Sequence, residues 1–259
     1  MGEAGISVIV PAYNEERMIG TTLDLLRTRL EETGLTWEIV VVDNASTDGT
    51  AAVVERFADG EQITLLRNDV NRGKGYSVRR GMLAASGELR LMCDADCGPS
   101  LDSLPRMLEA MERADIVAGS RNAADADVDR TQPLRRRLVG WPFIALTRLI
   151  MREPTHDIYC GFKLFRGVAA EAVFSRQSLD GWVFDAEILA LARRLGYRVT
   201  EVGIRWADRE GSKLSIFQVL VPAVRELLAA RRNVRGQAPR DGHASELVLD
   251  PVDSRESVG

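Results

Sequence analysis

Short apolar stretches alternate with helical ones through the first half of this chain, and that alternation limits the folds it can adopt. Five stretches have the composition of buried strands: 6–10, 37–42, 63–66, 88–93 and 116–118. Between the first two, Ile19, Leu23, Leu26 and Leu30 recur at helical spacing. Strands and helices that alternate with short loops predict an α/β domain with a doubly wound, mostly parallel sheet.

The overall composition is that of an ordinary soluble globular protein, with 45% hydrophobic and 28% charged residues in 259. A net charge of −4 argues against general nucleic-acid binding, and no apolar run is long enough to span a bilayer. The three cysteines, Cys93, Cys97 and Cys160, are few and odd in number, and no secretory signal precedes them. This favours reduced thiols in the cytosol, with a structural rather than zinc-binding role for Cys93 and Cys97.

Two carboxylates, Asp94 and Asp96, follow directly after the fourth predicted strand. Ligands of open α/β sheets gather beyond the carboxyl ends of the strands, and carboxylate oxygens suit Mg²⁺ or Mn²⁺. Taken alone, an Asp-x-Asp pair more often belongs to a solvated turn with helix-capping acids. Its neighbours at the same sheet edge decide in favour of a site.

Three further polar segments are expected at that edge. Pro11–Glu15 follows the first strand, Asp43–Ser46 follows the second, and the loop Asn71–Gly75 supplies glycines together with Arg72 and Lys74 for phosphate. Together these segments predict a pocket for a base, a ribose, a diphosphate and a metal, which is a nucleotide-sugar site. No Gly-x-Gly-x-x-Gly follows the first strand, which disfavours a dinucleotide-binding dehydrogenase.

The second half of the chain contains two amphipathic segments, 138–152 and 214–232, with arginines at their ends. Apolar residues with basic flanks are typical of helices that lie in a membrane interface, although the first segment fits a core helix equally well. Residues 122–132 are polar and aperiodic and are expected to form a mobile loop over the site. A single domain over 1–232 is therefore predicted, followed by a disordered polar tail over 233–259.

The motifs, taken in order, resemble those of the GT-A glycosyltransferases of family 2. The matching segments are Val10–Glu15, Val41–Thr50, Asn71–Gly75 and Asp94–Asp96, and downstream Gly119–Arg121, Asp157–Phe165, Trp182–Glu187 and Glu210–Leu214. The downstream set is similar to polyprenyl-phosphate hexosyltransferases, of the dolichyl-phosphate β-glucosyltransferase or mannose synthase kind. All three lysines of the chain, Lys74, Lys163 and Lys213, fall inside these motifs.

The resemblance implies a role for each matching residue on the donor side. Base and ribose would contact Pro11, Tyr13, Glu15 and Asp43. Diphosphate and sugar would lie near Arg72, Lys74, Asp94 and Ala95, with Ser212 and Lys213 closing over the phosphates. Asp96, with Asp94, would hold Mg²⁺ or Mn²⁺.

On the acceptor side, Arg121 and Arg136 would hold the lipid phosphate, and Asp157 and Lys163 belong to the neighbouring motif. Catalysis is expected from Asp94, Asp96, Arg121, Arg136 and Asp157. For Trp182, Asp185 and Glu187, both a structural role and a position facing the sugar remain open. Mannose synthases of this type often carry Gln two positions beyond the second aspartate, where this chain has Gly98, which favours the glucosyl type.

The predicted activity is metal-dependent, inverting transfer of a hexose from UDP-glucose, or next GDP-mannose, to a polyprenyl phosphate. The enzyme would be cytoplasmic and attached peripherally to the cytoplasmic face of a membrane, without a nucleic-acid partner. Two alternatives remain open: a family 2 transferase with a soluble acceptor, and a nucleotide-sugar-binding module without turnover.

Overall fold

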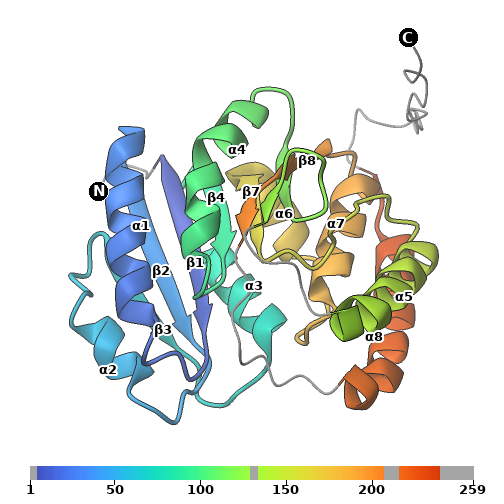
Figure 1. The fold of residues 1–259 in the computed structure, drawn as a ribbon, viewed down its shortest axis with the longest axis horizontal. Coiled ribbons are helices and arrows are strands. Elements are labelled where there is room, and N and C mark those ends of the chain that lie inside the picture. Colours follow the sequence, from blue (N-terminus) through green and yellow to red (C-terminus); the bar gives the residue numbers. More distant parts are fainter. Residues whose placement is uncertain (1–4, 129–133, 207–215, 240–259) are drawn as a thin grey trace.

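A seven-stranded sheet with helices on both faces forms the centre of the molecule (Figure 1). The computed structural model describes residues 5–128, 134–206 and 216–239, and only the backbone of 134–141 and 216–222. In spatial order the strands are β3 (Ile63–Arg67), β2 (Trp37–Asp43), β1 (Ile6–Ala12), β4 (Leu89–Cys93), β7 (Phe162–Arg166), β5 (Ile116–Ser120) and β8 (Val199–Gly203). All neighbours pair in parallel except β7, which is antiparallel to β4 and β5. The predicted doubly wound, mostly parallel α/β fold is confirmed.

The first five predicted strands match β1 to β5 closely, but β7 was not predicted as a strand. It alternates faces, since Phe162 and Leu164 join the core on one side of the sheet while Phe165 joins the core on the other. Residues 199–206 form two separate strands, β8 and β9 (Arg205–Trp206), and β9 pairs with β6 (Asp127–Val128). Part of the predicted loop 122–132 is therefore a short strand.

The helices connect these strands in the expected order. They are α1 (Ile19–Thr33), α2 (Thr50–Glu55), α3 (Lys74–Ala84), η1 (Gly98–Ser103), α4 (Leu104–Ala110), α5 (Leu134–Met151), α6 (Gly167–Phe174), α7 (Phe184–Arg194) and α8 (Ile216–Gly236). Because α8 continues to Gly236, the predicted tail cannot begin at Asn233; residues 240–259 lie outside the described residues.

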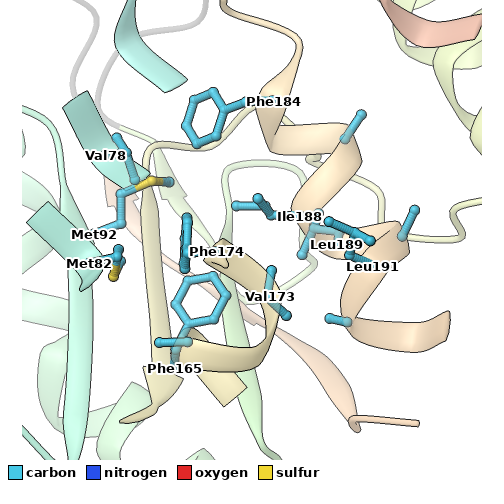
Figure 2. Close-up of a cluster of buried hydrophobic side chains, with 14 of the residues drawn as sticks. Val78, Met82, Met92, Phe165, Val173, Phe174, Phe184, Ile188, Leu189 and Leu191 are labelled. Carbon is cyan, nitrogen blue, oxygen red and sulfur yellow. The ribbon is translucent and has the colours of Figure 1, made fainter. Parts of the chain in front are cut away.

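One face of the sheet packs against α3, α6 and α7 around a core of aliphatic, aromatic and methionine side chains (Figure 2). Phe165 of β7 meets Phe174 of α6 edge-on, with ring centroids 5.3 Å apart. Phe184, the first residue of α7, is fully buried in the same cluster. This packing fixes the start of α7 beneath the carboxyl end of the sheet, next to the polar residues described below.

The two predicted interfacial segments form α5 and α8, which pack against each other at one side of the molecule (Figure 1). Helix α8 buries Ala223, Leu227 and Ala230 in the core, so part of it serves as a core helix. Outward-facing Leu149 of α5 is 74% exposed and Leu228 of α8 is 45% exposed. In the part of the chain that the structure describes, no helix meets the length and hydropathy that a membrane span requires.

Cys93 and Cys97 form a disulfide, which corrects the prediction of reduced thiols. The backbone turns tightly here because the Cys97 N–H donates to the Asp94 carbonyl oxygen at 3.0 Å. The turn brings the two Cα atoms to 5.9 Å, within the range that a disulfide bridges. Cys160 is a buried free thiol, and burial raises its pKa to about 11.

Candidate active site

The loops that follow β1 and β2 are joined by hydrogen bonds at the carboxyl end of the sheet. The Asn14 side-chain oxygen accepts from the Thr47 N–H at 2.8 Å, and the Glu15 N–H donates to the Thr50 hydroxyl at 2.8 Å. Asn14 and Ala45 both have positive φ angles, 57° and 59°, which only a well-supported turn tolerates outside glycine. The two loops therefore act as one rigid wall.

This wall carries the four residues predicted to contact base and ribose. Tyr13 is 45% exposed and free to stack on a planar ligand, whereas Pro11 and Glu15 are half-buried. Asp43 is only 1% exposed, and its carboxylate accepts from the Ser46 N–H at 3.2 Å. The structure thus brings all four to one edge, with the Asp43 carboxylate at the floor.

A network of side-chain amides connects this wall to the glycine loop. Asn44, buried at the end of β2, accepts from Asn68 at 2.9 Å and from the Arg72 N–H at 3.1 Å, and donates to Asn71 at 2.9 Å. Gly73 has φ of 99°, and a Cβ there would overlap the Asp180 carbonyl. The loop therefore needs glycine to lie against the segment before α7.

Arg72 lies on the outer side of the same loop. Its guanidinium is 4.0 Å from the centre of the Tyr76 ring and 3.5 Å from the Asp180 carboxylate. The side chain is half exposed, so it remains available to an anion.

Lys74 and Asp94 form the central ion pair of the site, with a shortest N–O distance of 2.6 Å. Burial by itself would lower the pKa of Lys74, but the charges of Asp94 and Asp185 raise it above its ordinary value. The ammonium also lies 5.4 Å from the centre of the Trp182 ring, which is 52% exposed. Trp182 is thus an accessible aromatic surface beside the central lysine.

Asp94 approaches β7 closely because residue 161 is glycine. A Cβ on Gly161 would overlap the Asp94 carboxylate. Ala95 is buried, and its carbonyl accepts from the Thr22 hydroxyl at 2.5 Å, so it contributes backbone rather than side chain.

Asp96 is exposed at the mouth of the site, one residue beyond the buried Ala95. Hard divalent cations bind carboxylates and complete their shell with water and phosphate oxygens, so Asp94 and Asp96 are suitable protein ligands for Mg²⁺ or Mn²⁺. Among the described residues no three His, Cys, Asp or Glu side chains converge on one point. The donor set fits a cation that is held jointly by protein and nucleotide.

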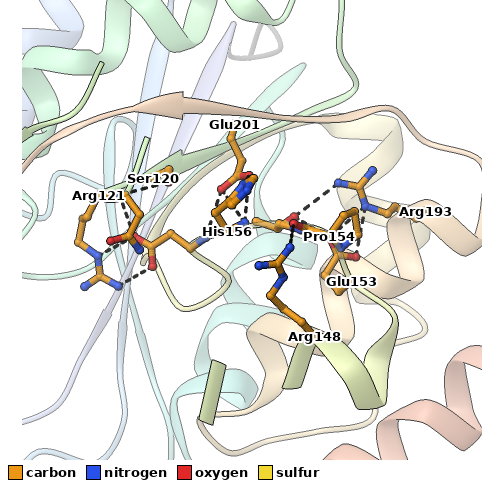
Figure 3. Close-up of polar contacts among 11 residues, drawn as sticks. Ser120, Arg121, Arg148, Glu153, Pro154, His156, Arg193 and Glu201 are labelled. Carbon is orange, nitrogen blue, oxygen red and sulfur yellow. Dashed lines mark hydrogen bonds and ion pairs between the residues drawn. The ribbon is translucent and has the colours of Figure 1, made fainter. Parts of the chain in front are cut away.

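Arg121 and Asp157 form a second ion pair (Figure 3). The guanidinium donates to both carboxylate oxygens at 2.7 Å, and the Arg121 N–H adds a third bond at 2.8 Å. Burial would raise the pKa of Asp157, yet the hydrogen bonds and charge of Arg121 hold it below its ordinary value. The Asp157 carboxylate is fully buried, so it positions Arg121 and does not itself contact substrate, contrary to the catalytic role predicted for it.

Glu201 of β8 holds the loop that carries Asp157, and the sequence analysis does not identify Glu201. Its carboxylate accepts from the backbone N–H groups of His156 and Asp157 at 3.0 and 3.2 Å (Figure 3). Glu153, in the same loop, is buried and pairs with Arg193 at 3.0 Å. Nothing in the local pattern distinguishes these acids from solvated ones, because their partners are about 40 residues away in sequence.

Lys163 does not reach the site surface, which corrects its predicted contact with substrate. Its side chain is 0% exposed and its ammonium lies 2.5 Å from the Asp185 carboxylate at the start of α7. Glu187 is also fully buried and accepts from Ser178 and Leu179. Asp185 and Glu187 are therefore structural.

Three predicted site residues cannot be located in this way. Ser212 and Lys213 lie outside the described residues. Arg136 belongs to the first turns of α5, where only the backbone is described.

The fold and the site together define a class of protein. In this class a mostly parallel sheet carries a carboxylate pair, a lysine and a glycine loop at the carboxyl ends of its strands. Solved structures share this architecture. A glucosyl-3-phosphoglycerate synthase from Mycobacterium tuberculosis, solved with Mn²⁺, UDP-glucose and phosphoglyceric acid, matches with a TM-score of 0.61 at 20% identity, covering 92% of this chain and 82% of that one. A mannosyltransferase from Pyrobaculum calidifontis, solved with GDP-Man and Mn²⁺, matches with a TM-score of 0.55 at 20% identity, covering 90% and 70%.

Sequence comparison gives the family. The model of glycosyl transferase family 2 matches residues 7–180. A dolichyl-phosphate beta-glucosyltransferase of Trichomonas vaginalis is 38% identical over 82% of this chain and 68% of its own length. Its counterpart in Drosophila melanogaster is 36% identical, over 82% and 70%. The chain belongs to glycosyl transferase family 2, and it is a glycosyltransferase.

Proposed function

We propose that this enzyme transfers a hexose from a nucleotide diphosphate sugar to a polyprenyl phosphate such as dolichyl phosphate, with UDP-glucose as the favoured donor and GDP-mannose next. The proposal rests on two cationic side chains that each form an ion pair with a carboxylate: Lys74 with Asp94, and Arg121 with Asp157. Burial alone would lower the pKa of Arg121, but the hydrogen bonds and charge of Asp157, with a smaller effect of the Asp94 charge, raise it, which supports a common site for both cations. One cation suits the donor diphosphate and the other an acceptor phosphate. The names of the relatives support the same reaction.

The chemistry needs little proton transfer, because a lipid monophosphate is already an anion near neutral pH. Its oxygen attacks the anomeric carbon while the bond from that carbon to the diphosphate oxygen breaks. Arg121 aligns the attacking phosphate, and Lys74 stabilises the charge that develops on the leaving diphosphate. A single in-line displacement inverts the anomeric centre, so an α-linked donor gives a β-linked product.

A divalent cation fits the donor side of this scheme. We infer that Asp96, together with Asp94, would hold Mg²⁺ or Mn²⁺ when the donor is bound. When bound, the cation would neutralise the departing nucleoside diphosphate. Arg72 and Tyr13 would bind phosphate and base, respectively.

We also infer peripheral attachment to a membrane surface, through α5 and α8. The support is the outward exposure of Leu149 and Leu228 next to exposed Arg152 and Arg232. A transferase with a soluble acceptor would have no use for this surface. Partition of the protein to anionic liposomes without detergent tests the inference, because an enzyme with a soluble acceptor would stay in solution.

The deciding experiment measures transfer of radiolabel from UDP-glucose or GDP-mannose to a polyprenyl phosphate, with Mg²⁺ or Mn²⁺ and an EDTA control. Lipid-phase label from one donor, lost in EDTA and in Asp96→Ala, is the expected result. Label in neither lipid sample, with metal-dependent donor hydrolysis still present, would refute the lipid acceptor but leave a transferase. Nucleotide-sugar binding without any turnover would favour the binding-module alternative.

A further inference from the structure

The two cysteines that form the disulfide enclose the carboxylate pair, in the order Cys93-Asp94-Ala95-Asp96-Cys97. The side chains alternate between two environments. Cys93, Ala95 and Cys97 belong to the core cluster beneath the sheet edge, whereas Asp94 pairs with Lys74 and Asp96 is exposed. The disulfide therefore closes a five-residue ring on the core side, with both carboxylates directed away from it.

Two hydrogen bonds hold the same ring. The Thr22 hydroxyl of α1 donates to the Ala95 carbonyl at 2.5 Å, and the Cys97 N–H donates to the Asp94 carbonyl at 3.0 Å. Each of these bonds can be lost to water by a small movement of the chain. The covalent link is not lost in this way, so of the three it alone keeps the turn closed when the hydrogen bonds break.

We propose that the Cys93–Cys97 disulfide is a positioning element that holds Asp94 and Asp96 in place for the donor diphosphate and its divalent cation. This inference rests on the proposed function. It differs from a general stabilising role because only the two predicted metal ligands and Ala95 lie between the two cysteines. Cys93 is 0% and Cys97 6% exposed, so the folded core shields the bond and slows its reduction.

The effect should be specific to the cation. Groups that orient metal ligands typically change metal affinity by about 10- to 100-fold when they are removed. Tyr13 and the loops after β1 and β2 lie outside the ring, so opening it should leave the base side of the site in place. Binding of UDP in the absence of metal should therefore hardly change, while the Mn²⁺ concentration needed for half-maximal UDP binding should rise.

The test compares the full chain with Cys93→Ala/Cys97→Ala by calorimetric titration of UDP over a series of Mn²⁺ concentrations. Cys160→Ala is the matched control, since it removes a buried sulfur from the same core cluster and leaves the disulfide intact. Alkylation under denaturing, non-reducing conditions followed by mass spectrometry counts the free thiols of each protein. Melting without ligand separates lost stability from lost positioning.

We expect one free thiol in the wild type, and in the double variant a Mn²⁺ requirement raised on the order of tenfold. The Cys160→Ala control should keep the wild-type requirement. Three free thiols in the wild type, or a double variant with wild-type Mn²⁺ dependence, would overturn the proposal. UDP binding that fails in the wild type at every Mn²⁺ concentration would instead refute the nucleotide-sugar site, and the positioning role with it.

If the double variant does not fold, the wild type can be opened directly with the phosphine TCEP. The disulfide takes up two electrons and two protons to give two thiols, and the phosphine leaves as its oxide with oxygen from water. The Mn²⁺ requirement should then rise in proportion to the fraction of opened ring measured by alkylation. A requirement that stays constant while the ring opens would refute the proposal.

Discussion

The buried ion pair between Lys163 and Asp185 allows a sharp test of the role of Lys163, which either binds substrate or stabilises the fold. The ammonium lies 2.5 Å from the Asp185 carboxylate and also donates to the Cys160 carbonyl at 2.5 Å. Side-chain exposures are 0% and 3%. Met is an unbranched side chain one atom shorter than Lys, so Lys163→Met removes the ammonium and leaves a buried carboxylate and a carbonyl without their donor.

The magnitude follows from this geometry. Breaking a buried ion pair by removing one partner costs about 3–5 kcal/mol of unfolding free energy. Asp185 keeps the charge of Lys74 nearby, so the lower end, about 3 kcal/mol, is the better expectation. For a domain of this size each kcal/mol lowers Tm by roughly 2–4 °C, which gives a decrease of roughly 6–12 °C.

Scanning calorimetry without any ligand measures this decrease for K163M and for the double variant K163M/D185L. Leu places two methyl groups where the carboxylate oxygens were, so the double variant removes both charges. Replacing a whole buried pair by apolar groups is often neutral, and most of the lost Tm should return. A K163M protein that melts within about 2 °C of the wild type but binds acceptor poorly would refute the scaffold role.

Three further predictions concern the site itself. Gly161→Ala places a Cβ against the Asp94 carboxylate and should lower kcat for hexose transfer by roughly 100-fold. The circular dichroism spectrum should stay unchanged, and a wild-type kcat would contradict the prediction. Trp182→Ala should weaken binding of UDP-glucose but not of UDP, measured by titration, whereas Trp182→Phe should retain most of it. Arg121 holds the pKa of Asp157 below its ordinary value of 3.8, so the stability of the wild type in urea should fall as the pH drops below that value. Asp157→Asn should be less stable than the wild type at neutral pH and should lose less stability in acid.

The sheet and its ligand edge were predictable because they depend on local pattern. Each of the first five strands is a short apolar run that ends in polar residues, and parallel topology places those ends together. The alternation in Phe162-Lys163-Leu164-Phe165 also fits a strand, but Lys163 interrupts the apolar run, and the segment was interpreted as a motif instead. Antiparallel pairing of β7 with β4 and β5 is a property of the whole sheet, which no local pattern specifies.

The roles of charged residues were less predictable than their presence. A lysine near phosphate-binding motifs is expected to contact phosphate, and Lys74 lies where that is possible. Lys163 is chemically identical, yet its partner Asp185 comes from a helix 22 residues later and buries it completely. The disulfide was missed for a related reason: two cysteines four residues apart bond only if the chain turns between them, and the turn depends on the Asp94 carbonyl and Thr22.

The two halves of the site are held by different means, and this difference bears on how the enzyme would work. On the donor side, hydrogen bonds join the loops after β1 and β2, amides join them to the glycine loop, and a disulfide closes the Asp94 turn. On the acceptor side, Arg121 depends on the buried Asp157, and the loop of Asp157 depends on the carboxylate of Glu201. In both halves the charges are fixed before any substrate arrives, so little reorganisation is needed as charge moves from acceptor phosphate to leaving diphosphate. Substitutions behind the site, at Glu201 or at Cys93 and Cys97, should therefore impair the reaction as strongly as substitutions at its surface, although none of these residues contacts a substrate.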